Sequence, residues 1–159
     1  MKIEIVTKKE VEVPGLTYPI LRRTARNTAR RLRGRDNHSL KEDAVVEVAL
    51  VSLQTITQLN ERHRGLDSPT DVLSYQLQLD APFPTPFEEI GGDQVFGCVA
   101  ICPDKARAQA SEQFRSLIWE MAFLLCHGLL HLAGWNHPDS PSLTEMNKLS
   151  QGILDHVFA

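Results

Sequence analysis

Four short stretches of the chain have the spacing of apolar residues that is typical of strands. Residues 2–7 and 72–79 alternate between apolar and polar, as a strand with one buried face does. Residues 45–51 and 96–101 are mostly apolar and are bounded by polar or turn-forming residues. We therefore predict four strands.

Elsewhere the apolar spacing is that of helices. In residues 18–32 the inward positions fall on one helical face, at Leu21, Ala25, Thr28, Ala29 and Leu32. Residues 117–126 are largely apolar and contain neither proline nor glycine, which predicts a buried helix. Helices are predicted over residues 18–32, from a cap at Ser52 to about Arg62, from Pro103, from Leu117 through His131, and from a cap at Ser140 or Ser142 to about Val157.

The order of the predicted elements indicates an α+β fold. Strands and helices alternate at first, two strands follow one another, and the chain ends in helices, which favours a small mixed sheet with helices packed on it. Residues 80–93 hold three prolines, two glycines and four acidic residues, so we predict a long loop there. A length of 159 residues predicts a single domain, 1–159.

Composition places the chain among ordinary globular proteins. Apolar residues make up 42% and charged residues 23%. The first residues lack the apolar core of a signal peptide, and no apolar run reaches membrane-spanning length, so we expect a cytoplasmic protein. Three dispersed cysteines do not suggest a disulfide framework, and Cys126 is expected to pack in the core.

The net charge of −3 hides a basic segment. Seven arginines and no acidic residue lie between positions 22 and 35, and four of them, at 22, 26, 30 and 33, have helical spacing. Two interpretations stay open for this stripe. It is either a solvated helix face or a surface that binds phosphate groups.

Three histidines near the C-terminus have the spacing of a catalytic metal site. His127 and His131 are four residues apart and would share one face of the predicted helix. Gly134 can adopt the left-handed conformation that ends a helix, and His137 follows in the returning chain. Two imidazoles from a helix and one from the next turn leave a coordination position open, which is typical of catalytic zinc. The alternative is three unrelated histidines with chance spacing.

The same spacing occurs in the H-E-x-x-H-x-x-G-x-x-H pattern of metzincin proteases, with one difference. Gly128 stands where those enzymes have the glutamate that acts as general base. The pattern therefore predicts similar metal geometry with a different reaction.

The run H-G-x-L-H-L-x-G-[YW]-x-H resembles the YbeY family of single-strand-specific metallo-endoribonucleases. Two upstream blocks agree with it, residues 59–64 followed by 69–75 and, more weakly, residues 97–103. The resemblance implies a sheet of about four strands around the histidine helix and a role in ribosomal RNA processing, including maturation of the 3′ end of 16S rRNA, and in ribosome quality control. It implies one zinc ion on His127, His131 and His137.

Arg64 occupies the arginine of the first upstream block and is the candidate for a catalytic group that grips phosphate. A surface salt bridge is the alternative. Thr70 and Asp71 could order the loop that carries Arg64, but they are expected to cap a turn. Two departures from the family pattern each remove a carboxylate, at Asn136 and Cys98.

Glu120 is a candidate partner for Arg64 or for a strand. Three further histidines are expected at the surface: His38, His63 and His156.

The leading hypothesis is thus a zinc-dependent endoribonuclease acting on single-stranded ribosomal RNA, with the ribosome or its proteins as possible partners. A metallopeptidase is the alternative that Gly128 disfavours. A non-catalytic, ribosome-associated RNA-binding module is a third hypothesis, prompted by Asn136 and Cys98. Three imidazoles suit zinc, although nickel, cobalt or copper bind the same ligands.

Overall fold

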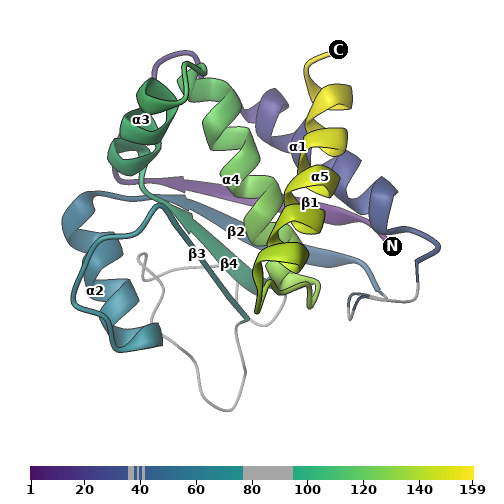
Figure 1. Ribbon diagram of the computed structural model, residues 1–159, viewed down its shortest axis with the longest axis horizontal. Coiled ribbons are helices and arrows are strands. Elements are labelled where there is room, and N and C mark those ends of the chain that lie inside the picture. The colour runs from purple at the N-terminus through teal and green to yellow at the C-terminus, as the bar shows by residue number, and fades with distance from the viewer. Residues whose placement is uncertain (36–37, 39, 41, 77–94) are drawn as a thin grey trace.

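The computed structural model describes residues 1–35, 38, 40, 42–76 and 95–159, which form a four-stranded sheet and five helices. The elements alternate as predicted (Figure 1). The strands are β1 (Ile3–Lys9), β2 (Ala44–Leu50), β3 (Val72–Gln76) and β4 (Val95–Ile101). The helices are α1 (Tyr18–Leu32), α2 (Leu53–Arg64), α3 (Pro103–Glu112), α4 (Leu117–Leu132) and α5 (Ser140–Val157).

The sheet is mixed, which confirms the predicted α+β class. Its strand order is β1-β2-β4-β3. The first three of these run parallel, and β3 pairs antiparallel with β4 at the edge. The predicted loop at residues 80–93, and the end of the predicted third strand beyond Gln76, lie outside the described residues.

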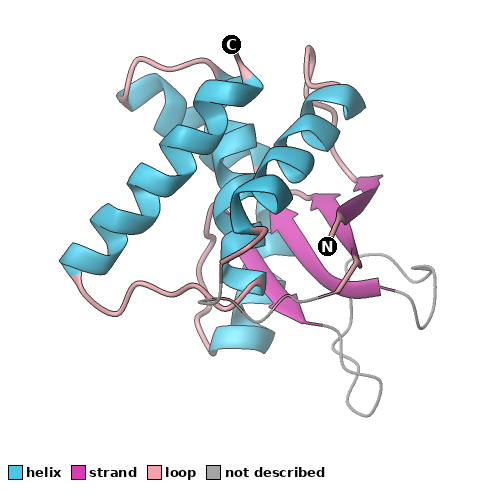
Figure 2. Cartoon of the chain, turned by 90° about the vertical axis from the view of Figure 1, so that its right-hand side faces the viewer, coloured by secondary structure: helices cyan, strands magenta, loops and turns pink. Residues whose placement is uncertain are grey.

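Each face of the sheet buries a different set of side chains, because successive residues of a strand point to opposite faces. On one face Val48 and Val99 pack with apolar residues of α4 such as Met121 and Leu125, in the core to which α1 and α5 also contribute. Figure 1 shows α1, α4 and α5 on this side of the sheet, with α2 on the other. The turned view in Figure 2 also places most of the helices to one side of the strands. The second face has a smaller core beneath α2.

Local signals explain where the helices begin. The Ser52 hydroxyl accepts a hydrogen bond from the backbone N–H of Thr55 (3.2 Å), which confirms the predicted cap of α2. The start of α5 was also predicted, but its cap was not. Asp139 is the N-cap, and its carboxylate accepts from the N–H of Ser142 (2.9 Å). Ser140 is instead the first helical residue.

Gly128 sets how closely α4 approaches the sheet. A Cβ atom at this position would lie 2.6 Å from Cγ1 of Val99 on β4. That distance is too short for two carbon atoms, so only glycine allows the observed contact. The helix that carries His127 and His131 is therefore seated directly on β4.

We expect Gly128→Ala to lower the free energy of unfolding by about 1–3 kcal/mol, because the added methyl group overpacks this contact. Gly152→Ala is the matched control in α5. Its Cβ would meet only the end of the flexible Arg31 side chain, and alanine is favoured over glycine in a helix by about 1 kcal/mol. Urea unfolding measures both. Equal stability of Gly128→Ala and the unchanged protein would contradict the close contact.

Candidate metal centre

Helix α4 presents two of the three predicted histidines one turn apart. The Ser116 hydroxyl caps the helix by accepting from the N–H of Trp119 (3.1 Å). The sheet-facing side of the helix is buried, while the rings of His127 and His131 are only partly buried. The pattern of the helix therefore places both imidazoles at the margin of the core.

A glycine-containing turn brings the third histidine back to the first two. The N–H of Trp135 donates to the carbonyl of Leu130 (3.0 Å), and that of Gly134 donates to the carbonyl of His131 (2.9 Å). These are the two hydrogen bonds of a Schellman motif, and Gly134 has the left-handed backbone it needs, with φ 96°. The chain reverses there, and His137 returns to α4.

The three imidazoles converge as their spacing predicted. Ring centroids are 4.6 Å apart for His127 and His131, 5.4 Å for His127 and His137, and 5.0 Å for His131 and His137. One nitrogen from each ring lies within 4.8 Å of the other two. A search of the described residues for three or more histidine, cysteine or acidic side chains that could hold one metal ion finds this cluster.

The donor atoms fit a divalent cation. The Nε2 atoms of His127 and His131 are 3.0 Å apart. Nitrogens bound to tetrahedral zinc at about 2.0–2.1 Å are about 3.3 Å from one another. The Trp135 carbonyl can only accept a hydrogen bond, so Nδ1 of His131 donates to it (2.9 Å), and Nε2 of the neutral ring keeps its lone pair.

The environment keeps two of the rings unprotonated. Burial is the largest cause that lowers the pKa of His127, to about 4, and the neighbouring His131 and His137 rings add to it. Burial also lowers the pKa of His131, although its hydrogen bond to Trp135 opposes that shift. Both rings are therefore neutral at pH 7, and the neutral imidazole is the form that binds a metal.

The histidines open into a cleft of about 650 Å³ between α4, β3 and the end of α2. Arg64, the last residue of α2, lines this cleft with an exposed side chain. Gly65 has a left-handed backbone (φ 70°) that ends α2 at this point. The charge of Arg64 is among the causes that lower the pKa of His131, so the guanidinium lies within electrostatic range of the cluster.

Asp71 also borders the cleft, but its carboxylate is engaged in holding the backbone. One oxygen accepts from the N–H of Val72 (2.7 Å), and the other accepts from the side-chain amide of Gln109 (3.0 Å). The capping role expected for this residue fits these contacts. Thr70 lines the cleft beside it.

The two departures from the family pattern lie in different places. Asn136 lines the cleft and is exposed. Cys98 is fully buried in the core under α2, next to Glu47 in the register of β2 and β4 and beside Tyr75. The carboxylate missing at position 98 is therefore on the opposite side of β4 from Val99 and Gly128.

Three expectations about other polar residues need correction. Glu120 is buried and pairs with Arg115 (3.8 Å), not with Arg64 or a strand. His38 is buried, with Nε2 2.8 Å from the Leu32 carbonyl. His63 is half-buried and stacks on Tyr75, with ring centroids 4.0 Å apart. These environments arise from tertiary packing, which local spacing does not reveal.

Sequence reasoning missed two contributions to the cleft. Ser74 and Gln76 of β3 line its wall, and the Trp135 carbonyl orients His131. An alternating strand shows which residues share a face, but it does not show which cleft they border.

Comparisons with known proteins agree with the motif resemblance. The family described as Endoribonuclease YbeY matches residues 18–157. A protein of that name from Moorella thermoacetica is 38% identical over 115 residues, which is 72% of this chain and 74% of the relative. One from Synechococcus sp. (strain JA-2-3B'a(2-13)) is 41% identical over 116 residues, 72% of this chain and 70% of the relative.

A solved structure shares the fold. The solution structure of TM1509 from Thermotoga maritima aligns with a TM-score of 0.58 at 26% identity, over 98% of this chain and 89% of that one. The family match covers both α2, which ends at Arg64, and the histidine cluster. This chain belongs to the endoribonuclease YbeY family.

Proposed function

We propose that this chain is a single-domain, zinc-dependent endoribonuclease that cleaves single-stranded ribosomal RNA. The observation that carries the proposal is the convergence of three imidazoles at a cleft in a member of this family. His127, His131 and His137 are the ligands in this proposal, and Arg64 binds the phosphate.

A zinc ion held there would supply Lewis acidity, which polarises a phosphoryl oxygen and makes hydroxide available near neutral pH. The protein's own residues orient the ligands and bind the phosphate. The Trp135 carbonyl fixes the tautomer and direction of His131. Arg64 offers a planar guanidinium to the non-bridging phosphate oxygens, where charge develops during cleavage.

The metallopeptidase hypothesis loses support for a steric reason. The general base of those enzymes would occupy position 128, where even a Cβ atom would collide with Val99. Position 128 faces β4 and not the cleft, so a glutamate at this position would be directed at the sheet. Phosphodiester cleavage, in which the Arg64 guanidinium binds the phosphate, fits this arrangement better.

His131→Ala is expected to lower the rate of RNA cleavage by more than about 100-fold, because loss of a ligand exceeds the usual effect of losing a ligand's hydrogen-bond partner. Chelation should do the same to the unchanged protein. His156→Ala, an exposed position on α5, is the control. The measurements are cleavage of an unstructured RNA and metal content per chain. Cleavage that survives both treatments would reject a metal-centred reaction, and cleavage of peptides with RNA left intact would favour the metallopeptidase.

Arg64→Ala is expected to lower kcat/KM by about 100- to 1,000-fold, since one donor to developing charge is removed. Arg64→Lys should recover part of this loss, because the charge returns without the bidentate geometry. Arg62→Ala is the matched control, an exposed arginine on the same helix that does not line the cleft. Equal rates for Arg64→Ala and Arg62→Ala would show that Arg64 is an ordinary surface residue with no part in the reaction.

A further inference from the structure

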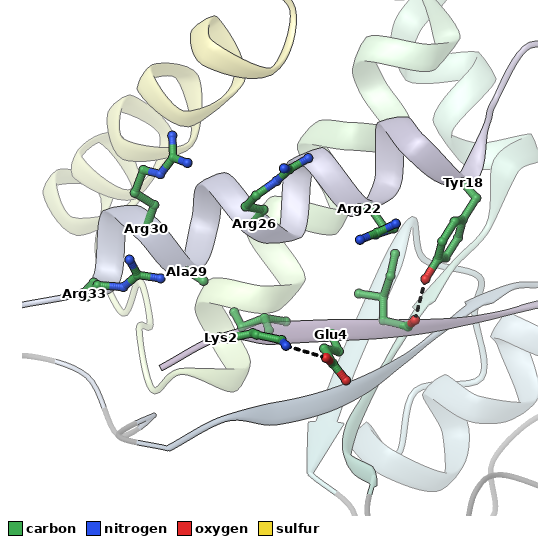
Figure 3. A pocket seen from close by; sticks show the side chains of 10 residues that line it. Lys2, Glu4, Tyr18, Arg22, Arg26, Ala29, Arg30 and Arg33 are labelled. Atoms are coloured by element: carbon green, nitrogen blue, oxygen red, sulfur yellow. Dashed lines mark hydrogen bonds and ion pairs between the residues drawn. The ribbon is translucent and has the colours of Figure 1, made fainter.

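A second recessed surface lies between α1 and the edge strand β1, away from the histidine cleft. It is a groove of about 430 Å³ whose walls carry three arginines of α1, a fourth arginine that directly follows the helix, and Lys2, which directly precedes β1. Figure 3 shows the arginines in succession along α1, with Lys2 and Glu4 on the strand below. The arginines are Arg22, Arg26, Arg30 and Arg33.

Among the described residues, carboxylates offset little of the positive charge of this groove. Glu4 is the one carboxylate among its lining residues, and it pairs with Lys2 (2.8 Å). Over residues 1–35, 38, 40, 42–76 and 95–159, no arginine of α1 forms an ion pair with an acidic side chain. The lining residues therefore carry a net charge of +4 on a chain whose net charge is −3.

The arrangement suits a linear polyanion. All four arginines are exposed, and Arg33 follows Arg22 by eleven positions, about 16 Å at a rise of about 1.5 Å per residue. A row of cations along a groove matches successive phosphates of one strand. A flat membrane surface would contact a convex or flat patch more readily than this recess.

An aromatic ring stands at one end of the row. Tyr18 is 47% exposed, and its hydroxyl donates to the carbonyl of Ile5 (3.2 Å), which holds the ring beside the groove. The guanidinium of Arg22 lies over the ring, 5.7 Å from its centroid. An exposed ring next to phosphate-binding arginines is the combination on which single-stranded nucleic acids stack their bases.

One end of the groove lies level with the histidine cluster along the strands. Tyr18 donates to the carbonyl of Ile5, so the start of α1 lies at Ile5 of β1. Leu132, next to His131, packs at Gly97 of β4, and the register of the sheet places Gly97 opposite Val46 of β2 and Val46 opposite Ile5. β1 and β3 are the two edges of the sheet, about 14 Å apart for three spacings of about 4.8 Å.

We propose that the α1–β1 groove is a second binding surface for single-stranded RNA, which holds the phosphate backbone of the strand that is cut at the histidine cleft. That the ligand is RNA rests on the proposed function. Stacked nucleotides advance about 3.4 Å each, so four or five cover the distance across the sheet, and an RNA of about 20 nucleotides reaches both surfaces. An RNA of about three nucleotides reaches only one.

The test compares two double variants that remove the same charge. Arg26→Gln/Arg30→Gln removes two groove arginines whose side chains form no hydrogen bond or ion pair with the described residues. Arg107→Gln/Lys148→Gln removes two exposed cations from α3 and α5. Binding of a fluorescent 20-nucleotide unstructured RNA is followed by anisotropy with chelator present, so that no cleavage occurs. Thermal unfolding checks that both variants fold.

The groove variant should bind at least about 5-fold more weakly. The slope of log affinity against log salt should fall by about 1.4, because each phosphate that an arginine no longer neutralises accounts for about 0.7. The Arg107→Gln/Lys148→Gln variant should change neither the RNA affinity nor the salt slope by a comparable amount. With metal restored, the groove variant should show a higher KM for the long RNA and an unchanged kcat, and it should cut the short RNA like the unchanged protein.

The proposal would be overturned if RNA binding were weakened equally in both double variants, or not weakened in the groove variant. So would binding to vesicles containing phosphatidylserine that depends on Arg26 and Arg30 while RNA affinity does not. The proposed function can fail separately. If the unchanged protein binds RNA through these arginines but does not cleave it at any metal supplement, the groove stands and the endoribonuclease does not.

Discussion

The contact between α4 and β4 is the constraint on which the site depends. Gly128 lets the helix lie directly on Val99, and the buried side chains of α4 leave His127 and His131 no place except the margin of the core. Because those imidazoles are fixed by the packing of the sheet, the cleft they border is fixed as well. The position of the histidine cluster is thus a consequence of how the core is assembled.

The end of α4 completes the site through backbone hydrogen bonds. The Schellman turn at Gly134 reverses the chain, and the Trp135 carbonyl that it positions accepts from His131. The same few residues therefore end the helix, orient one imidazole and return His137. The arginine-lined groove lies at the other edge of the sheet, so the structure pairs a neutral, partly buried cluster with an exposed cationic groove.

Much of this arrangement could be predicted from the sequence where the signal is local. The bounds of α1 follow from its inward face, and the histidine cluster follows from the i, i+4 spacing with Gly134 between His131 and His137. Competing local signals explain the missed cap of α5, since Asp139, Ser140 and Ser142 are all good cap residues. Tertiary contacts explain the other errors. The partner of Glu120 and the reason for glycine at 128 depend on elements that the sequence does not place together.

X-ray absorption at the zinc edge of the purified, metal-loaded protein tests the central claim most directly. We expect one zinc ion per chain, with three imidazole nitrogens at about 2.0–2.1 Å and a light-atom ligand in the remaining position. His137→Ala should lower the number of imidazole scatterers to two. Sulfur at about 2.3 Å, or a fourth protein imidazole, would contradict an open three-histidine site.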